Sequence, residues 1–427
     1  MRFQRLADWL SWQETLHPNP IDLGLERLQR TLVRLGWRRP ECPVMTVGGT
    51  NGKGSTVAFA ARILRESGYS VGTFTSPHLV RYNERIAVDE VEASDVVLME
   101  AFERIDAARG SDTLTFFEFN TLAALLVFER ERPDALLLEV GMGGLLDAVN
   151  VVDADVAVVT SIALDHCEWL GSDVESIGRQ KAGIFRAGRP AIYGARSMPH
   201  SVVRVASEMG ADLRYLGRDF DWERGTSDWS WRGRQVRYEH LPTPSLVGEQ
   251  QYDNAAAVLA SLETLVGRLE VPRHAIDRGL RTAQLPGRFQ RVSGPVEWIL
   301  DVAHNPAAAA GLARQLRGEP TRGRTLAVVG ILGDKDIKGV LQELRGSVDT
   351  WVIAGLASTR ALSASALADR VSRAGGSVAA TAVDVVGACE AAAAAARPHD
   401  RVVVFGSFLT VGPALEWLRR TGRLTAA

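Results

Sequence analysis

Continuous apolar segments alternate with segments of helical periodicity through the first part of the chain. Uninterrupted apolar segments predict strands at 44–47, 70–74, 135–140 and 155–160. Apolar residues at helical spacing predict helices at 55–67, 94–108 and 116–131. Because the strands are apolar on both faces and alternate with helices, the pattern is typical of an α/β fold with a mostly parallel sheet covered on both sides.

This alternation stops between residues 215 and 245, where three tryptophans, Trp222, Trp229 and Trp231, stand among charged residues. We expect a β-rich excursion there, followed by two helices at 252–265 and 272–283. The alternation restarts after Pro286-Gly287-Arg288, which has the composition of a hinge. The later strands are predicted near 296–300, 325–329, 350–353, 377–380 and 401–405. The pattern therefore predicts two α/β domains, 1–287 and 288–427, of which the second is the smaller.

Composition and charge exclude several classes of protein. The chain of 427 residues is 46% hydrophobic and 23% charged, and its formal net charge is −2. This balance argues against nucleic acid or an anionic membrane as the main partner, because both attract basic surfaces. No uninterrupted apolar run could cross a bilayer, and the N-terminus lacks the apolar core of a signal peptide. The three widely spaced cysteines suggest neither a disulfide framework nor a zinc site, so we expect a cytoplasmic protein.

Lysine is rare in this chain. Only four of the 49 basic residues are lysines, and they are Lys53, Lys181, Lys335 and Lys338. Where arginine is the general surface cation, lysine is retained best at places that need a compact ammonium or a titratable amine. We therefore expect functional roles for Lys53 and Lys181, and leave the roles of the other two open.

A glycine-rich segment, Gly48–Gly54, joins the first apolar strand to its helix. Successive backbone N–H groups in such a loop, with the N-terminus of the following helix, bind phosphate. Lys53 would reach the outer phosphates, and a hydroxyl of Ser55 or Thr56 would serve Mg²⁺ or a phosphate oxygen. The spacing departs from the general nucleotide-binding pattern, because Gly54 stands where Ser or Thr normally follows the lysine. The alternative is a glycine turn that only connects the strand to the helix.

Polar side chains follow three of the predicted strands. Ser76 and His166 each come shortly after a strand, and Glu139 ends an otherwise apolar one. Ligand sites in open parallel sheets lie at the carboxyl ends of the strands, so we expect these groups near the phosphates. Hard oxygen ligands suit Mg²⁺, whereas an imidazole is a less usual ligand for it. A helix cap or a core histidine remains the alternative for His166.

Lys181 lies at the end of a predicted helix. A lysine there can compensate the charge of the helix C-terminus, but an arginine would do so equally well. We therefore expect an amine that must react or change its charge.

In the second domain, Asp301, His304 and Asn305 follow a predicted strand, and Pro306 opens a helix. Asp301 and His304 could reach a ligand, and simple capping of the helix by Asn305 is the alternative. Gly406-Ser407-Phe408 also follows a predicted strand.

Together these motifs resemble the folylpolyglutamate synthase and dihydrofolate synthase family, within the Mur ligase superfamily of ATP-dependent amide-forming enzymes. The resemblance runs from near residue 20 to near residue 420. The segments that carry it are Gly49–Ser55, Thr75–Leu79, Phe117–Phe119, Glu139–Gly144, Thr160–His166, Lys181–Ile184, Leu300–Pro306 and Gly406–Phe408. The Ser-Pro-His-Leu and Phe-Glu-Phe segments favour the folate branch over the cell-wall ligases.

The resemblance implies a P-loop ATP-binding domain, 1–287, and a Rossmann-like glutamate-ligase domain, 288–427. It implies ATP contacts from Gly49, Thr50, Asn51, Gly52, Lys53, Gly54, Ser55, Asn254, Arg288, Asp301 and His304. It also implies two Mg²⁺ sites, one held by Ser76 and Glu139 and the other by Glu139, His166 and a carbamylated Lys181. Catalytic roles would then fall to Lys53, Lys181 and His166. Phe117 and Asp147 match positions around the pteridine, and His304 with Ser407 would bind glutamate.

Three positions depart from the family pattern. Leu145 stands where many members have Arg, Val149 where many have Thr, and Val302 where many have Gly. The first two lie near the expected pteridine pocket and bear on which acceptor is used.

The implied reaction is ATP-dependent addition of L-glutamate to dihydropteroate and to reduced folates through an acyl phosphate. We expect a monomer that acts on these small molecules, with no nucleic acid or membrane partner. Three alternatives remain: one of the two activities only, another Mur-type amide ligase, or a nucleotide-hydrolysing switch protein. A cell-wall ligase would need a larger N-terminal domain than the residues before the glycine loop provide. A switch protein would leave Lys181 and the second domain without a role.

Overall fold

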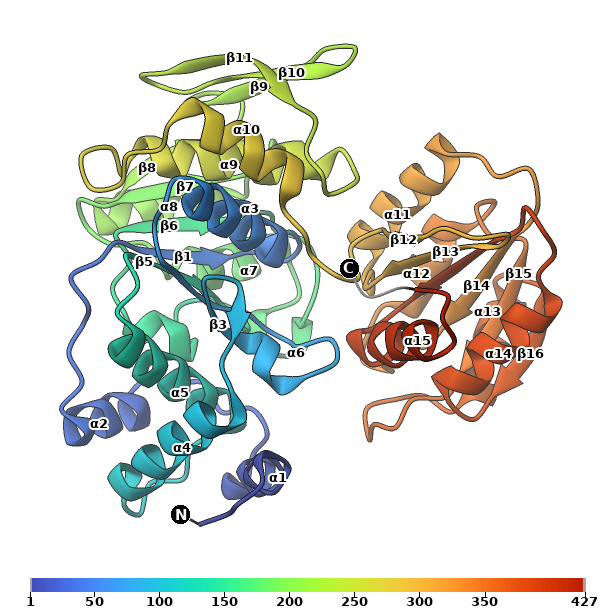
Figure 1. Cartoon of the computed structure of the whole chain (residues 1–427), viewed down its shortest axis with the longest axis horizontal. Coiled ribbons are helices and arrows are strands. Elements are labelled where there is room, and N and C mark those ends of the chain that lie inside the picture. Colours follow the sequence, from blue (N-terminus) through green and yellow to red (C-terminus); the bar gives the residue numbers. More distant parts are fainter. Residues whose placement is uncertain (1, 425–427) are drawn as a thin grey trace. The chain divides into compact units, whose positions relative to one another are not determined.

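The structure, a computed structural model, describes residues 2–424 and divides the chain into two compact units. The first unit comprises the chain up to Ser245 together with Gln250–Ala283. The second comprises Leu246–Glu249 together with the chain from Gln284 onward. Figure 1 shows both units as α/β structures, each built around a sheet.

An eight-stranded sheet forms the centre of the first unit. Its strands are β1 (Val44–Gly48), β2 (Val71–Phe74), β3 (Ile86–Val88), β4 (Val91–Glu92), β5 (Ala135–Glu139), β6 (Val156–Val159), β7 (Pro190–Tyr193) and β8 (Asp212–Tyr215). They lie in the order β4-β3-β2-β5-β1-β6-β7-β8, and β1 pairs in parallel with both β5 and β6. Because only the pairings made by the short strand β3 are antiparallel, the mostly parallel sheet expected from the sequence is confirmed.

Helices cover both faces of this sheet (Figure 1). They are α1 (Leu6–Leu16), α2 (Glu26–Leu35), α3 (Lys53–Glu66), α4 (Asp95–Arg109), α5 (Phe116–Glu131), α6 (Cys167–Leu170), α7 (Val174–Ala182), α8 (His200–Met209), α9 (Gln250–Glu263) and α10 (Arg273–Thr282). On one face, α5 buries Phe119 and Phe128 in a core shared with Phe74 of β2. The helices α3, α9 and α10 pack together on the other face. There Gly279 of α10 lies so close to Ile63 of α3 that a Cβ would approach its side chain to 2.4 Å.

The expected β-rich excursion is a three-stranded antiparallel sheet. Its strands are β9 (Asp221–Arg224), β10 (Asp228–Arg232) and β11 (Arg237–Pro242). Trp229 and Trp231 are buried, and Trp222 stacks on Tyr252 of α9 with ring centroids 5.0 Å apart. The tryptophans that interrupt the sequence pattern therefore attach this small sheet to α9.

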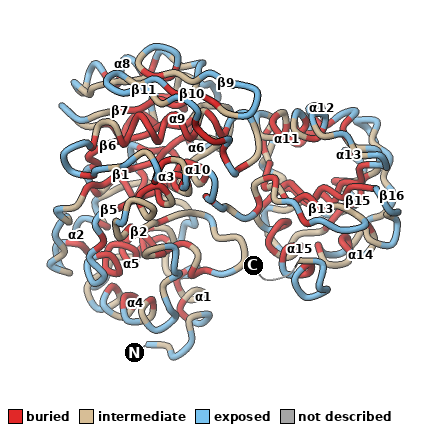
Figure 2. Tube along the Cα trace, turned by 45° about the horizontal axis from the view of Figure 1, so that its top comes forward, coloured by how far each residue is buried: buried red, intermediate tan, exposed pale blue. Residues whose placement is uncertain are grey.

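The second unit contains a six-stranded sheet in the order β12-β13-β17-β14-β15-β16. Its strands are β12 (Gln290–Val292), β13 (Glu297–Asp301), β14 (Thr325–Val329), β15 (Thr350–Ala354), β16 (Val378–Ala382) and β17 (Arg401–Phe405). Its helices are α11 (Pro306–Gly318), α12 (Ile337–Leu344), α13 (Ala364–Arg373), α14 (Val385–Ala395) and α15 (Phe408–Arg420). Figure 2 shows its central strands buried and the outer faces of its helices exposed. The alanine run Ala391–Ala395 lies in α14.

The unit boundary differs slightly from the one read from the sequence. Gln284–Gly287 fall in the second unit, where the Gly287 carbonyl accepts a hydrogen bond from the backbone of Val302. Leu246–Glu249 also belong there, because Gln315 donates a hydrogen bond to the Val247 carbonyl and Val247 packs on the second core. Sequence patterns could not reveal this early segment, since it is too short to have a period.

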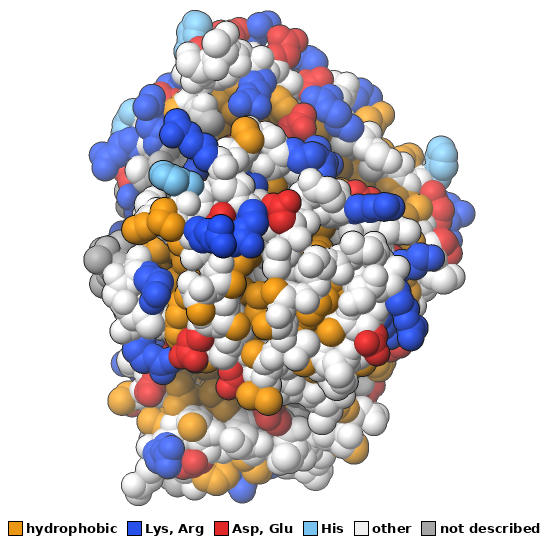
Figure 3. Space-filling model, turned by 90° about the vertical axis from the view of Figure 1, so that its right-hand side faces the viewer, with side chains coloured by type: hydrophobic (Ala, Val, Ile, Leu, Met, Phe, Trp, Pro, Cys, Tyr) orange, Lys and Arg blue, Asp and Glu red, His pale blue; other side chains and the backbone are white. Residues whose placement is uncertain are grey.

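Two surface features bear on possible partners. Figure 3 shows acidic and basic side chains interspersed over one face of the structure, so neither sign dominates that face. Among residues 2–424, no helix combines the length and the apolar character needed to cross a membrane.

Asp155, just before β6, links four segments at the amino end of the first sheet. Its carboxylate lies 2.7 Å from Arg39, 2.9 Å from Arg189 and 2.7 Å from Arg268, and it accepts the Val44 N–H at 2.9 Å. Burial alone would raise the pKa of Asp155, but the Val44 N–H and the arginines hold it below its usual value of 3.8. Three cations and one backbone group therefore depend on a single buried carboxylate.

We expect Asp155→Asn to lower the free energy of unfolding by about 2–3 kcal/mol, because the arginines lose a buried partner but are themselves partly exposed. The pKa of Asp155 is lower folded than unfolded, so its contribution is present above about pH 4 and is lost as the pH falls further. Urea unfolding at several pH values measures both effects. Asp153→Asn, at a side chain that is 72% exposed, is the matched control. Equal unfolding midpoints for the two variants would contradict the assignment.

Candidate active site

The glycine-rich loop between β1 and α3 has a shape that only glycine allows at two positions. Gly49 has φ 135°, and a Cβ there would lie 2.0 Å from the Thr160 hydroxyl. Gly52 has φ 94°, and a Cβ there would lie 2.5 Å from Oδ1 of Asn254. The Thr50 N–H donates to the Ser161 carbonyl at 2.7 Å, which ties the loop to the segment after β6. The loop is therefore held at the carboxyl end of the sheet, against α9.

Two lysines donate to the same carbonyl oxygen in this loop. Nζ of Lys53, the first residue of α3, lies 3.1 Å from the Gly49 oxygen and 3.3 Å from the Thr50 oxygen. Nζ of Lys181, near the end of α7, lies 2.9 Å from the Gly49 oxygen. Burial first, and then the charge of Lys53, lower the pKa of Lys181 to about 7. An amine with such a pKa is uncharged in a large fraction of molecules at neutral pH.

The carboxyl ends of β2 and β5 bring Ser76 and Glu139 together. The Ser76 N–H donates to Oε2 of Glu139 at 3.1 Å, and Glu139 is buried. Glu139 is also the β5 residue that pairs with Val47, next to the glycine loop. An acid at the end of an apolar strand thus lies at the edge where the loop begins.

His166 precedes the short helix α6 and has a left-handed backbone, with φ 52°. Its backbone N–H donates to the Asp165 carboxylate at 2.9 Å. The charge of Asp165 acts on the Lys181 amine, so this loop faces Lys181. Within the described chain, no group of three or more His, Cys, Asp or Glu side chains is arranged to hold a metal ion. A metal here would need ligands of other kinds as well.

Phe117 and Asp147 border the loop that follows β5. Phe117 stacks on Phe74 with centroids 5.8 Å apart, and a Cβ on Gly141 would lie 2.4 Å from its ring. The Asp147 carboxylate accepts the N–H groups of Met142 and Val149 at 2.8 and 3.0 Å. Burial, against these hydrogen bonds, raises the pKa of Asp147 to about 7. Asp147 therefore fixes the shape of this loop, whatever else it binds.

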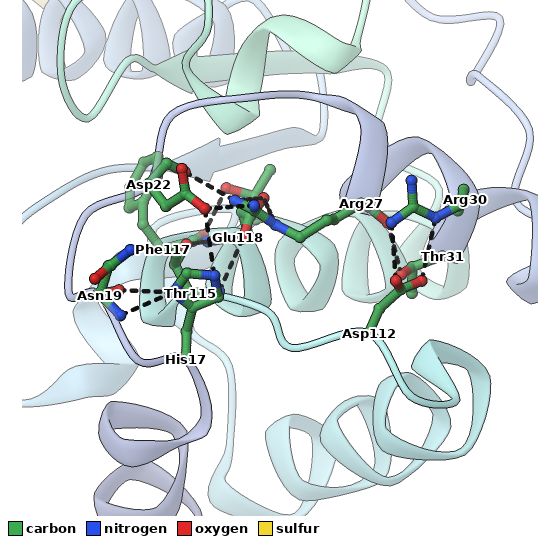
Figure 4. Close-up of polar contacts among 11 residues, drawn as sticks. His17, Asn19, Asp22, Arg27, Arg30, Thr31, Asp112, Thr115, Phe117 and Glu118 are labelled. Atoms are coloured by element: carbon green, nitrogen blue, oxygen red, sulfur yellow. Dashed lines mark hydrogen bonds and ion pairs between the residues drawn. The ribbon is translucent and has the colours of Figure 1, made fainter.

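Sequence patterns did not reveal the segment before α2, which lies against the N-terminus of α5 (Figure 4). Arg27 pairs with Asp22 at 2.6 Å and with the buried Glu118 at 3.1 Å. Glu118 also accepts the Thr115 N–H at 2.8 Å, which caps the helix that carries Phe117. Arg27 and Glu118 are 91 positions apart, so no local pattern could have joined them.

Sequence patterns also did not reveal Arg85, which precedes β3. Its side chain is buried, and Nε donates to Nδ1 of His78 at 2.8 Å. The guanidinium lies over the rings of Tyr82 and Phe116, at 5.9 and 5.6 Å from their centroids. The charge of Glu139 acts on it. The Ser-Pro-His motif marked this region in the sequence, but nothing marked the arginine.

In the second unit, the expected residues gather at the carboxyl end of its sheet. Asp301 is held by the N–H groups of Phe289 and Ala303, at 2.9 and 2.8 Å, and burial raises its pKa against the charge of Arg288. Nδ1 of His304 lies 2.8 Å from the Val302 carbonyl oxygen. The capping contacts are made by Asn305 for α11 and by Ser407 for α15.

The structure therefore links most of the expected residues within each unit. In the first unit these are the loop Gly49–Ser55, Asn254, Lys181 and the pair Ser76–Glu139. In the second, the charges of Arg288 and His304 both lower the pKa of Asp301 against the effect of its burial. The Arg288 guanidinium also lies 5.2 Å from the ring centroid of Phe408, the residue after Ser407.

Comparison with known proteins identifies the family. The Mur ligase middle domain matches residues 47–262, and the Mur ligase glutamate ligase domain matches residues 287–408. The dihydrofolate synthase/folylpolyglutamate synthase of Escherichia coli (strain K12) is 47% identical over 98% of this chain and 97% of its own. That of Mycobacterium tuberculosis is 32% identical over 94% of this chain and 91% of its own.

Solved structures agree with these sequence matches. Escherichia coli FolC in complex with DHPP and ADP superposes with a TM-score of 0.93 at 46% identity, covering 98% of this chain and 99% of that one. The Yersinia pestis bifunctional enzyme complexed with AMPPNP and Mn ion superposes with a TM-score of 0.90 at 44% identity, covering 97% and 98%. The resemblance read from the motifs is confirmed, and the chain belongs to the dihydrofolate synthase/folylpolyglutamate synthase family of Mur ligases.

Proposed function

We propose that this protein adds L-glutamate to dihydropteroate and to reduced folates, with ATP cleaved to ADP and phosphate. The observation that carries the proposal is the pair Lys53 and Lys181, whose amines both donate to the Gly49 carbonyl of a glycine-rich loop. The loop alone would suit many nucleotide-binding proteins. A buried second lysine with a pKa near 7 is not required by a simple phosphate-binding loop, and it suits the carbamylated lysine that the family resemblance implies.

ATP is proposed to bind at the loop Gly49–Ser55. Its N–H groups and the N-terminus of α3 suit phosphate oxygens, and Lys53 supplies a point charge beside them. Asn254 lies against Gly52 and would contact the nucleotide base. In the second unit, Arg288, Asp301 and His304 are proposed to bind the nucleotide, and His304 with Ser407 to bind glutamate.

Two Mg²⁺ ions are proposed, since the donors present suit hard cations. Ser76 and Glu139 would hold one, and Glu139, His166 and a carbamylated Lys181 the other. Bound Mg²⁺ would neutralise negative charge on the transferring phosphoryl group. Related structures with AMPPNP and Mn ion support the use of a divalent metal by this family.

Carbamylation of Lys181 is supported by its surroundings. Carbamate forms when an uncharged amine attacks CO₂ and releases a proton, so an amine with a pKa near 7 reacts more readily than an exposed lysine. The product is an anion with two oxygens. It would relieve the repulsion between the two lysines, because a negative group would then face Lys53.

In the proposed reaction, the acceptor carboxylate attacks the γ-phosphate of ATP and becomes an acyl phosphate. The amino group of glutamate then displaces phosphate and forms the amide. The chain contributes mainly position and charge, as is usual in phosphoryl transfer. Phe117 offers an aromatic face to the pteridine, and Asp147 offers lone pairs that its two backbone contacts leave over.

The partners are proposed to be small molecules only, with the enzyme acting as a cytoplasmic monomer. The near-neutral net charge of −2 supports the absence of nucleic acid and membrane partners.

Lys53→Arg should lower turnover by about 100-fold or more and leave the unfolding midpoint unchanged, because a guanidinium is too large for a point charge inside this loop. Glutamate-dependent ADP release measures the effect. Lys338→Arg, at an exposed position on α12, is the matched control and should behave as the unchanged protein. Full turnover by Lys53→Arg would refute the phosphate-binding role of the loop.

Lys181→Ala should lose about 100-fold in turnover, and added acetate or propionate should restore part of it by replacing the carbamate. In the unchanged protein, ¹³C-bicarbonate should give a carbamate carbon resonance that grows as the pH rises through about 7, since the pKa of Lys181 lies there. The Lys181→Ala variant should lack that resonance. An unchanged protein without it, at any pH, would rule out the modification.

The acceptor is tested by ADP release with glutamate present, comparing dihydropteroate with a reduced folate. We expect turnover with both, because the proposed site at Phe117 would bind the pteridine that they share. Leu145→Arg should lower KM for the longer, more anionic acceptor by several-fold. Turnover with dihydropteroate alone would contradict the proposed polyglutamylation activity. Turnover with neither acceptor would contradict the assignment of a folate substrate.

A further inference from the structure

Arg85 is a buried cation that makes no salt bridge with a described acid, although the charges of Glu139 and Glu84 act on it. The residue is 7% exposed. Only its Nε donates to another described residue, and the acceptor is Nδ1 of His78. Burying a charge in this way is costly unless an anion is bound there for part of the working cycle.

The neighbours of Arg85 explain why it stays unpaired. The carboxylate of Glu84 is taken up by the N–H groups of Leu79, Val80 and Arg81, at 2.7–2.8 Å. Burial and the charge of Arg85 lower the pKa of His78 to about 4, so the imidazole is neutral and accepts the Arg85 Nε–H through Nδ1. The fixed Nε contact leaves the two terminal nitrogens for another group.

The contacts of Arg401 differ from those of Arg85. Arg401 is also buried, but its terminal nitrogens donate to the carbonyls of Glu319 and Leu316 and to the Thr325 hydroxyl. Its guanidinium is therefore used in holding the second unit together. Arg85 instead rests on the faces of Tyr82 and Phe116, which orient it but supply little to its outer edge.

Arg85 lies between two parts of the proposed active site. Its carbonyl accepts the Thr75 N–H at 2.9 Å, one residue before Ser76, and the charge of Glu139 acts on its guanidinium. Phe116, whose ring lies under the guanidinium, precedes Phe117 in α5. An acceptor that stacks on Phe117 and presents its carboxylate toward Ser76 and Glu139 would bring that carboxylate toward Arg85, because the charge of Glu139 acts on the Arg85 guanidinium.

We propose that Arg85 binds the reacting carboxylate of the acceptor through its two terminal nitrogens and positions it for attack on ATP. The inference rests on the proposed function. A planar guanidinium matches a carboxylate with two parallel hydrogen bonds, which fix the direction of the attacking oxygen. The same chemistry would suit a phosphate oxygen of ATP, but Lys53 and the glycine loop already supply that role.

The test compares Arg85→Met with Arg81→Met, a control four residues away whose side chain is 63% exposed. The ligands are dihydropteroate and its carboxamide analogue, which keeps the pteridine and ring but has no charge. In Arg85→Met, the dissociation constant of dihydropteroate should rise about 10- to 100-fold, and that of the carboxamide should change less than about twofold. Arg81→Met should bind both as the unchanged protein does.

Two further measurements distinguish carboxylate binding from a structural or nucleotide-binding role of Arg85. Arg85→Lys keeps the charge but loses the planar fork, so it should weaken dihydropteroate binding by several-fold and spare the carboxamide, which matters if Arg85→Met does not fold. KM for ATP should stay unchanged in both variants. Equal losses for the acid and the carboxamide would reduce Arg85 to a structural residue. A rise in KM for ATP alone would assign it to the nucleotide.

Failure of the proposed function would look different. The unchanged protein and Arg81→Met would then show no glutamate-dependent ADP release with dihydropteroate or with a reduced folate. That result would refute the proposed function and, with it, the inference about Arg85. If both proteins turn over normally while Arg85→Met weakens binding of the acid and of the carboxamide equally, or of neither, only the inference about Arg85 is overturned.

Discussion

The carbonyl oxygen of Gly49 is the group on which the chemistry of the first unit depends. Its direction follows from a backbone angle that a side chain would forbid, because a Cβ would overlap Thr160. Lys53 and Lys181 reach it from different helices, 128 residues apart in the chain by their numbers, and both donate to it. Two like charges so close, one of them buried, force one amine toward its uncharged form. A single carbonyl thus couples the phosphate-binding loop to the chemistry of a second lysine.

Buried acids serve opposite purposes at the two ends of the same sheet. At the amino end, Asp155 is surrounded by arginines and a backbone N–H, so its charge is fully used in holding segments together. At the carboxyl end, Glu139 accepts the Ser76 N–H and lies where cations are expected. The polarity of the sheet separates the two roles. The carboxyl ends of the strands carry the residues proposed to react, and the amino ends carry residues that hold the structure together.

The sequence predicted the elements with strong local patterns and missed those that depend on distant contacts. The strands at 325–329 and 401–405 have the expected bounds, because continuous apolar runs between turns are unambiguous. The glycine loop and Lys181 were found from their motifs. The pairing of Arg27 with Glu118 was missed, because the two residues are far apart in the sequence and only the fold brings them together. Arg85 was missed because one of 45 arginines carries no signal of burial.

The short segment Leu246–Glu249 has a consequence for how the chain becomes folded. The first unit has all of its parts once Ala283 has been synthesised, but the second unit includes this segment, which interrupts the first unit shortly before its end. The Val247 carbonyl can accept its hydrogen bond only after Gln315 has been synthesised. Val247 itself packs on a core formed by later residues. During synthesis on the ribosome, the first unit is therefore complete before most of the second has been made. The second unit, in contrast, includes a segment that was synthesised before its own remaining residues. No single cut in the gene would yield both halves intact.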